Sequence, residues 1–227
     1  MSAQGFFVTG TDTEVGKTWA TLALMGAWKK QGKRVAGMKP VASGCKEGAG
    51  GLRNEDALLI QSLCSERFPY DWINPCAYNP PIAPHIAAEQ CGRPVDVEAI
   101  KSAYEFLRQR SEVVVVEGIG GWRVPLSDKT SLIDIVQSLN LPVLLVVGLR
   151  LGCINHALLT VESVDINGCR LAGWIASPVD EHYSTTDETI TALKQRLTSP
   201  FLGILPRLPE PDVSRLSEGV RLELLGK

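Results

Sequence analysis

The feature that most constrains this chain is a glycine-bearing loop at residues 10–18, with the sequence Gly-Thr-Asp-Thr-Glu-Val-Gly-Lys-Thr. The apolar run 6–8 before it is typical of a buried strand, and the apolar run 19–28 after it is typical of a helix. Strand, loop, Gly-Lys-Thr and helix is the order of a phosphate-binding loop, in which backbone N–H groups at the helix N-terminus attract an anion. We therefore expect the Lys17 ammonium to bind nucleotide phosphates and the Thr18 hydroxyl to bind Mg²⁺.

The loop departs from the common phosphate-loop pattern, which has glycine in the place of Thr11. Here Gly10 stands one residue earlier, and the acidic Glu14 occupies a position that is often small. A carboxylate beside phosphates is electrostatically unfavourable, so Glu14 either faces away from them or meets a cation or an amine. The second alternative would indicate a second substrate that carries positive charge.

The overall composition argues against several classes of protein. The chain has 227 residues and a net charge of −2, without a block of Lys and Arg, which argues against a nucleic-acid partner. No apolar run approaches the roughly 18–20 residues of a membrane span, and the chain starts without a basic leader, so we expect a cytoplasmic protein. The six cysteines lack C-x-x-C spacing, which favours reduced thiols over disulfides or a zinc site.

Strand-like and helix-like segments alternate after the loop. We expect strands at residues 33–38, 113–116, 142–147, 171–176 and 201–205, and helices at residues 54–63, 95–110, 131–139, 154–164 and 187–197. The glycine-rich residues 44–53 are predicted to be a mobile loop, and the proline-rich residues 68–85 an excursion from the regular pattern. A short helix is expected within the tail 212–225.

This alternation predicts one α/β domain over residues 1–227, doubly wound, with a mainly parallel sheet and helices on both faces. Right-handed crossovers bring the C-terminal ends of parallel strands to one edge of the sheet, where ligands bind. The polar residues that follow the predicted strands are therefore candidates for one site: residues 11–18, 39–43, 117–121, 150–155, Ser177 and residues 206–208.

Three residues of that edge, together with Asp56, suggest specific chemistry. Lys39 directly follows a strand and is a candidate to stabilise charge during phosphoryl transfer, although a solvated turn lysine is the alternative. Asp56 lies in the first turn of a predicted helix, where stabilisation of the helix dipole is the alternative. Glu117 ends a strand of valines, and Thr18, Asp56 and Glu117 together form an all-oxygen set that suits Mg²⁺.

Six segments closely resemble the dethiobiotin synthetase family of biotin biosynthesis. They are G-T-D-T-E-V-G-K-T at 10–18, K-P-V-A-S-G at 39–44, G-L-R-N-x-D at 51–56, V-E-G-x-G-G-W at 116–122, L-G-C-I-N-H-A at 151–157 and L-A-G-W at 171–174. The resemblance extends from about residue 6 to residue 208, in the same order and with matching spacing.

The resemblance implies a homodimeric, ATP- and Mg²⁺-dependent ligase that carboxylates and cyclises 7,8-diaminopelargonic acid with carbon dioxide. One amine takes up carbon dioxide to give a carbamate, whose oxygen attacks the γ-phosphate. The second amine then closes a five-membered urea ring, and phosphate leaves. A diamine substrate would account for the carboxylate of Glu14 in the loop.

Site residues carried over from the resemblance fall into four groups. The catalytic group is Thr13, Lys17 and Lys39, and the metal ligands are Thr18, Asp56 and Glu117. The nucleotide group adds Glu14, Val15, Gly16, Trp19, Gly118, Ile119 and Gly120. Substrate contacts are Thr13, Lys39 and Ser43, together with Gly152, Cys153, Ile154 and Asn155, which in this family come from the neighbouring subunit and cap the substrate carboxylate at a helix N-terminus.

The chain departs from the family where the nucleotide base would bind. The family often has alanine where this chain has Ile119, and it usually has Asn-Asp where this chain has Ser177 and Pro178. The bordering segment is kept as Pro206, Arg207 and Leu208, with Asp212 as a candidate ribose contact. A serine cannot offer a paired donor and acceptor to a base edge, so we expect weak discrimination between nucleoside triphosphates.

Two alternatives come from other functional classes. A partitioning-type ATPase of the same loop superfamily would usually carry a second lysine near the start of the loop, where this chain has Asp12. A glutamine-dependent amidoligase would need a glutaminase domain with a Cys/His pair, for which 227 residues leave no room.

Overall fold

A computed structural model describes residues 3–48 and 50–225. Its central sheet has six strands in the order β10-β9-β8-β1-β7-β2, and every neighbouring pair is parallel. The strands are β1 (Gln4–Gly10), β2 (Val35–Met38), β7 (Val113–Glu117), β8 (Val143–Leu149), β9 (Leu171–Pro178) and β10 (Phe201–Ile204). The predicted α/β fold with a parallel sheet is confirmed.

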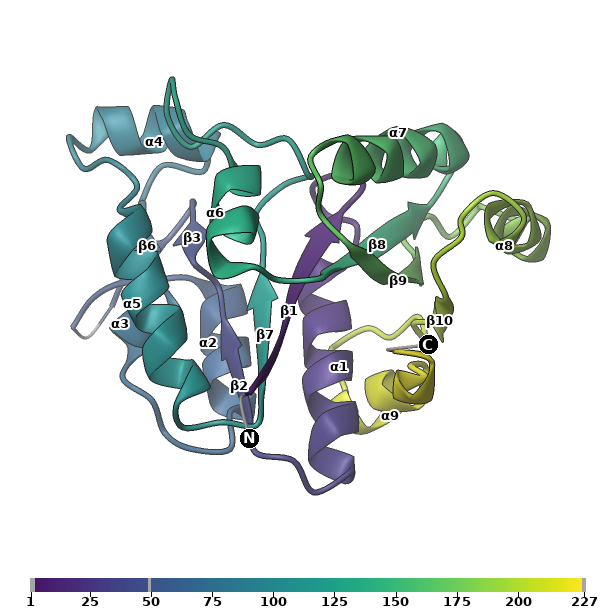
Figure 1. Cartoon of the computed structure of the whole chain (residues 1–227), viewed down its shortest axis with the longest axis horizontal. Helices are drawn as coiled ribbons and strands as arrows, with labels where there is room; N and C mark the ends of the chain where they lie inside the picture. The colour runs from purple at the N-terminus through teal and green to yellow at the C-terminus, as the bar shows by residue number, and fades with distance from the viewer. Residues whose placement is uncertain (1–2, 49, 226–227) are drawn as a thin grey trace.

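Helices lie on both faces of this sheet (Figure 1). The structure has α1 (Lys17–Lys30), α2 (Glu55–Leu63), α3 (Tyr70–Ile73), α4 (Pro84–Gln90), α5 (Val97–Arg108), α6 (Leu132–Leu139), α7 (Cys153–Ile166), α8 (Thr186–Lys194), α9 (Val213–Glu218) and a 3₁₀ turn, η1 (Leu222–Leu224). Helix α1 packs against α2 and α9, and α5 packs against α6. In the described part of the chain, no helix is both long enough and apolar enough to span a membrane.

The central strands have the composition that burial on both faces requires. All five residues of β7 and all seven residues of β8 are buried, and β7 begins with four consecutive valines. Branched side chains fit such a doubly covered strand, because they pack well on the pleated surface. Because these strands run parallel, the polar residues that follow them lie at the same edge of the sheet, toward which the strand arrows point in Figure 1.

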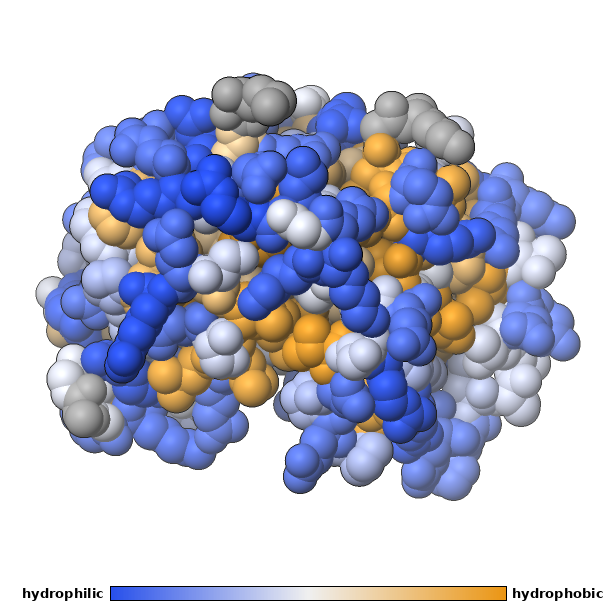
Figure 2. Space-filling view, turned by 90° about the horizontal axis from the view of Figure 1, so that it is seen from below, coloured by the Kyte–Doolittle hydropathy of each residue, from blue (hydrophilic) through white to orange (hydrophobic). Residues whose placement is uncertain are grey.

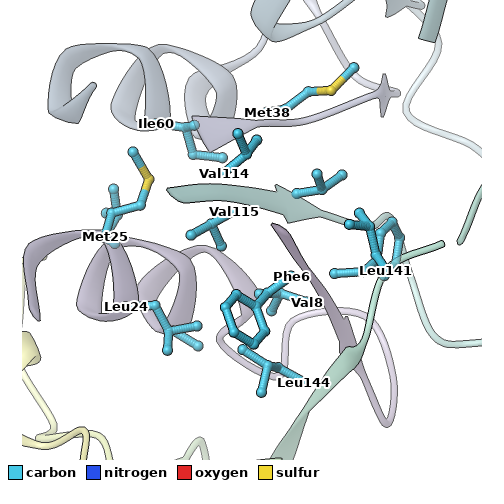
Figure 3. Packing of buried hydrophobic residues seen from close by; sticks show 14 of the residues in the cluster. Phe6, Val8, Leu24, Met25, Met38, Ile60, Val114, Val115, Leu141 and Leu144 are labelled. Carbon is cyan, nitrogen blue, oxygen red and sulfur yellow. The ribbon is translucent and has the colours of Figure 1, made fainter. Parts of the chain in front are cut away.

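The core is continuous between the sheet and the helices α1 and α2. Figure 3 shows Leu24 and Met25 of α1 and Ile60 of α2 beside Val114 and Val115 of β7. The close approach needs glycine at position 37 of β2, since a Cβ there would lie 2.4 Å from Ile60 and 2.6 Å from the sulfur of Met25. From below, the surface is largely hydrophilic, and apolar residues gather near its middle (Figure 2).

Two segments differ from the sequence-based expectation. The predicted mobile loop 44–53 contains an antiparallel pair of short strands, β4 (Lys46–Gly48) and β5 (Gly51–Arg53), joined through Ala49, which lies outside the described residues. Its glycines favour a tight turn as well as a loop, because Gly50 and Gly51 have positive φ.

The proline-rich excursion 68–85 is also more ordered than its composition indicated. It contains α3, strand β6 (Cys76–Ala77), which pairs with β3 (Val41–Ala42), and the first residues of α4. Pro84 occupies the first turn of α4, where a missing N–H costs nothing. The tail contains the predicted short helix, as α9.

Candidate active site

A cleft of about 1000 Å³ opens at the C-terminal ends of β1, β2 and β7. Parallel α/β sheets bind their ligands at this edge. The cleft brings together twelve of the residues singled out in the sequence: Thr13, Glu14, Gly16, Lys17, Thr18, Trp19, Lys39, Ser43, Asp56, Glu117, Ile119 and Gly120.

The loop after β1 adopts a conformation with two left-handed residues. Gly16 has φ 87° and directly precedes helix α1, and Glu14 has φ 57°, which is strained for a residue with a side chain. Gly16 is also required by packing, since a Cβ there would lie 2.4 Å from the Ser177 hydroxyl. No side chain of the described residues caps α1, which leaves its first N–H groups available to an anion.

Lys17 begins α1 and is almost completely buried, at 8% exposure. Its ammonium donates a hydrogen bond to the carbonyl oxygen of Asp12 at 2.8 Å, across the loop. Burial lowers the pKa of Lys17 to about 8, and the nearby Lys39 ammonium acts in the same direction against the attraction of Glu117. A phosphate group bound at this loop would give the Lys17 ammonium a negatively charged partner, which it lacks in the free protein.

Lys39 lies between two carboxylates, and this arrangement was not foreseen. Its ammonium donates to Glu117 Oε1 at 2.6 Å and to Asp56 Oδ2 at 2.7 Å, and Thr18 donates to the same Glu117 oxygen at 2.9 Å. Burial lowers the pKa of Lys39, but the two carboxylates outweigh it and hold that pKa above its ordinary value. Burial raises the pKa of Asp56, and the Lys39 ammonium outweighs it and holds that pKa below its ordinary value.

The predicted metal ligands lie close together around Lys39. Thr18 donates to Glu117 Oε1, the Lys39 ammonium bridges Glu117 and Asp56, and Glu117 Oε2 is buried with no hydrogen-bond partner among the described residues. A buried carboxylate oxygen without a partner is costly, and a hard cation would satisfy it. The residues present therefore fit Mg²⁺. In the described chain, neither this site nor any other has three or more His, Cys, Asp or Glu side chains grouped to hold a metal ion, so Mg²⁺ here would depend on the Thr18 hydroxyl beside the two carboxylates.

One wall of the cleft is apolar, and the sequence analysis did not identify it. It consists of Leu59, Pro81, Ile82, Ala83, Pro84, Val124 and Pro125. Leu59 and Ile82 are 39% and 37% exposed, so they present apolar surface to the cleft that they line. The sequence feature that indicated this wall was the cluster of prolines just before α4. The sequence analysis interpreted that cluster only as an excursion from the alternation of strands and helices.

Asp12 and Arg150 were also missed as a pair. The Arg150 guanidinium donates to Asp12 Oδ2 at 2.5 Å, and Asp12 Oδ1 accepts the Thr13 N–H at 2.7 Å. The Thr13 N–H lowers the pKa of the Asp12 carboxyl, with a further contribution from Arg150. Both residues belong to the predicted polar edge, one after β1 and one after β8, and these strands are neighbours in the sheet.

The remaining predicted residues do not line this cleft. Ser177 and Pro178 end β9, and Arg207 pairs with Glu181 at 3.0 Å. Val15 packs against Gly10 and Gly148, and Gly118 packs beside Phe7 and Leu132. The Asp212 carboxylate caps α9 by accepting the N–H groups of Ser214 and Arg215. Their proposed contacts with a nucleotide base and ribose stay predictions. The other predicted residues outside the cleft are Gly152, Cys153, Ile154, Asn155, Pro206 and Leu208.

Solved structures with a similar fold include a cell division protein complex and a signal recognition particle receptor. The MinC:MinD cell division protein complex of Aquifex aeolicus matches with a TM-score of 0.58 and 17% identity, covering 98% of this chain and 88% of that one. The signal recognition particle receptor FtsY of Elizabethkingia anophelis in complex with GDP matches with a TM-score of 0.52 and 14% identity, covering 100% and 64%. At these identities the likeness concerns the fold alone.

Relatives found by sequence share a much higher identity with this chain. A family model described as an AAA domain matches residues 4–214. The ATP-dependent dethiobiotin synthetase BioD of Aromatoleum aromaticum is 44% identical over 219 residues, covering 96% of this chain and 97% of that protein. The enzymes of the same name from Xanthomonas oryzae and Pseudomonas aeruginosa are 45% and 46% identical, covering 98% and 97% of this chain and 99% and 97% of their own lengths.

These relatives match the chain over nearly its whole length, at an identity well above that of the fold neighbours. The phosphate-binding loop, the buried Lys39 and the two carboxylates around it lie inside the matched region. The chain therefore belongs to the ATP-dependent dethiobiotin synthetase family.

Proposed function

We propose that this protein forms dethiobiotin from 7,8-diaminopelargonic acid, carbon dioxide and ATP, releasing ADP and phosphate. The observation that carries the proposal is the buried Lys39 ammonium, held by Glu117 and Asp56 beside a phosphate-binding loop. A fixed cation at that place suits a reaction in which one anion must attack another. The relatives' shared name supports the same activity.

The loop provides the nucleotide site. The free N–H groups at the start of α1 and the Lys17 ammonium would bind the outer phosphates of ATP. Lys17 would exchange its bond with the Asp12 carbonyl for phosphate oxygens, and these charges would raise the pKa of the ammonium again. Trp19 follows the loop and lines the cleft beside it.

Thr18, Asp56 and Glu117 would hold Mg²⁺. The ion would neutralise charge on the phosphates when the nucleotide is bound. Glu117 contributes a fully buried carboxylate, and its free Oε2 supports this assignment.

The chemistry assigns a separate task to Lys39. An amine of the substrate attacks the carbon of carbon dioxide and loses a proton, which gives a carbamate. A carbamate oxygen then attacks the γ-phosphorus of ATP and ADP leaves, which produces a carbamic–phosphoric anhydride. The Lys39 ammonium would reduce the repulsion between carbamate and γ-phosphate, and because this repulsion peaks in the transition state, the lysine would lower the barrier.

The same cleft offers groups for the diamine. Thr13, Glu14 and Ser43 line it beside the loop, and the exposed Glu14 carboxylate would attract a protonated amine before it reacts. The second amine attacks the carbonyl carbon of the anhydride, the five-membered ring closes and phosphate leaves. The apolar wall around Leu59 and Ile82 would accommodate the aliphatic chain.

We propose further that the active form is a homodimer. Gly152 precedes α7 with φ 91°, and no side chain of the described residues caps this helix, so its first N–H groups are available to a carboxylate. Residues 152–155 do not line the cleft of their own chain. A second copy would have to bring them to the substrate, as the family resemblance implies.

The decisive experiment measures phosphate release from MgATP in the presence of diaminopelargonic acid and bicarbonate. Each of the three components is left out in turn, and the product is identified by mass spectrometry. We expect phosphate release coupled to dethiobiotin formation only in the complete mixture. ATP hydrolysis that does not depend on the diamine would refute the proposal and favour an ATPase switch.

A further inference from the structure

A buried hydrogen-bond network joins the backbones of Asn54 and Lys39, and its two central side chains belong neither to the sequence motifs nor to the proposed mechanism. Its centre is the pair Tyr70 and Asn74, at the two ends of the short helix α3. The two side chains are only 7% and 3% exposed. Polar groups buried this deeply need partners, and their choice of partner shows what they hold in place.

The network links two separate parts of the backbone. The Tyr70 hydroxyl accepts the Asn54 N–H at 2.8 Å and donates to Asn74 Oδ1 at 3.0 Å. Asn74 Nδ2 then donates to the carbonyl oxygen of Lys39 at 2.6 Å. The Lys39 N–H in turn donates to the Ile73 carbonyl oxygen at 2.8 Å, so both backbone groups of the lysine are bound to α3 and its C-cap.

Each of these two backbone segments carries one half of the central ion pair. Asn54 is the N-cap of α2, where its Oδ1 accepts the Ala57 N–H at 3.1 Å, and Asp56 lies in the first turn of that helix. Lys39 follows β2 on the other segment. The Lys39 ammonium and the Asp56 carboxylate lie 2.7 Å apart. The Tyr70 hydroxyl and the Asn74 side-chain amide connect the backbones of the two segments that carry them.

We propose that Tyr70 and Asn74 are positioning residues that set the geometry of Lys39 against Asp56. They touch neither substrate nor nucleotide in this arrangement, because neither residue lines the cleft. The proposal rests on the functions proposed above for Lys39 and Asp56. A displacement of catalytic groups by about 1 Å lowers turnover by about a hundredfold, so the effect would exceed that of an ordinary buried hydrogen bond.

The test uses Tyr70→Phe, which keeps the ring and its contact with the Arg53 guanidinium, 4.2 Å away, and removes only the hydroxyl. The matched control is Tyr104→Phe, because Tyr104 is equally buried but its hydroxyl lies beside Gly5 and Leu141, at the opposite end of the sheet. A second variant, Asn74→Asp, keeps the shape and the acceptor but removes the donor to the Lys39 carbonyl.

The first measurement does not depend on any activity. Amide hydrogen exchange at Asn54 is expected to accelerate at least about tenfold in Tyr70→Phe and to stay unchanged in Tyr104→Phe, since the Asn54 N–H loses its acceptor only in the first variant. In Asn74→Asp the Lys39 carbonyl oxygen loses its donor, and the Lys39 N–H, which binds the Ile73 carbonyl oxygen in the same segment, is expected to exchange faster as that segment loosens. Unchanged exchange in both variants would overturn the proposal even if the wild-type protein formed no dethiobiotin, so its failure is distinguishable from failure of the proposed function.

The second measurement separates positioning from stability. Tyr70→Phe is expected to lower kcat by about ten- to a hundredfold while nucleotide affinity measured without Mg²⁺ stays within about twofold, because the loop 10–18 is outside the network. In a Lys39→Gln background, Tyr70→Phe is expected to lower kcat less than twofold further, since the group that it positions is gone. A full further decrease in that background, or a Tyr70→Phe enzyme as active as Tyr104→Phe, would overturn the proposal.

Discussion

The ammonium of Lys39 and the carboxylate of Glu117 lie 2.6 Å apart, and the two side chains are 6% and 0% exposed. A buried charge is costly unless it is paired, so each of these groups requires the other. The pair closes one side of the cleft, and Asp56 joins it from the more exposed side. A cation is thereby held at the sheet edge with little exposure to solvent.

Lys39→Gln is expected to keep nucleotide affinity within a few-fold and to lower turnover by about 10²–10³. The reason is that the fixed cation stabilises the transition state more than it stabilises bound nucleotide. Lys17→Gln is expected to lower both nucleotide affinity and turnover. Lys39→Arg should restore activity only partly, since its planar fork spreads the charge. Nucleotide titration and phosphate release under saturating substrates measure the two quantities.

The matched control for this experiment is Lys46→Gln. Lys46 also pairs with a carboxylate, Glu55, but both side chains are largely exposed, so its loss should affect neither quantity. A Lys39→Gln enzyme with wild-type turnover would make Lys39 a structural residue and would remove the central cation from the mechanism.

Loss of Lys39 should also affect folding, because the Glu117 carboxylate would stay buried without its partner. We expect Lys39→Gln to lower the free energy of unfolding by about 3–5 kcal/mol, and Lys39→Gln with Glu117→Gln to recover part of that loss. Urea denaturation measures both changes. A double variant less stable than the single variant would contradict the assignment of this cost to the unpaired carboxylate.

Asp56→Asn and Glu117→Gln should each weaken Mg²⁺-dependent nucleotide binding and turnover together, because each removes an oxygen charge from the proposed metal site. Nucleotide binding is titrated with and without Mg²⁺, and binding without the metal is expected to change less. Full activity in the double variant would refute the metal assignment.

Lys17 makes nucleotide affinity depend on pH. Its pKa is about 8 in the free protein, so the ammonium loses its proton as the pH rises through that value, and ATP affinity should decrease. The stability of the fold should instead increase as the pH rises. Between about pH 8 and pH 10.5 the unfolded chain holds a proton on Lys17 that the native protein lacks, so the free energy of unfolding increases across this range.

The comparison with Lys17→Met isolates this contribution, since other groups titrate in the same range. The difference in the free energy of unfolding between wild type and variant should vary between pH 8 and pH 10.5. A difference that stays constant over this range would show that Lys17 retains an ordinary pKa.

The pair of Asp12 and Arg150 should hold the nucleotide loop in position. Because its side chains are 50% and 39% exposed, the pair is worth less than about 1 kcal/mol, and Arg150→Ala should weaken ATP binding by no more than about fivefold. Asp12→Asn should have no further effect in the Arg150→Ala background. Arg108→Ala, which breaks a comparable pair on α5, serves as the control and should leave ATP binding unchanged.

Discrimination between nucleoside triphosphates is expected to be about tenfold or less, since Ser177 offers a single hydroxyl where the family usually offers an amide. Ser177 also packs against Gly16 of the loop, so Ser177→Asn should weaken the binding of all triphosphates by displacing that loop. Competition assays with ATP, GTP and CTP measure both effects. A thousandfold preference of the wild-type protein for ATP would contradict the first expectation.

Local order in the sequence determined the phosphate-binding loop, the alternation of strands and helices, and the polar edge of the sheet. These features depend on residues that are near neighbours in the chain. A buried strand needs a run of apolar residues such as 113–116, and a loop that approaches phosphates needs glycine, so the pattern alone predicts them. The resemblance to the family rests on the same local segments.

Tertiary structure decided which of these residues touch one another. Lys39 and Glu117 are 78 positions apart, and Asp12 and Arg150 are 138 apart. The first pair meets because β2 lies beside β7 in the sheet, and the second because β1 lies beside β8. No periodicity could reveal that Tyr70 and Asn74 bind the backbones of Asn54 and Lys39, since their partners depend on how an irregular segment folds against β2. Pairing between distant segments is fixed by packing of the whole chain, and for that reason the ion pairs and the network behind them became visible only in the folded structure.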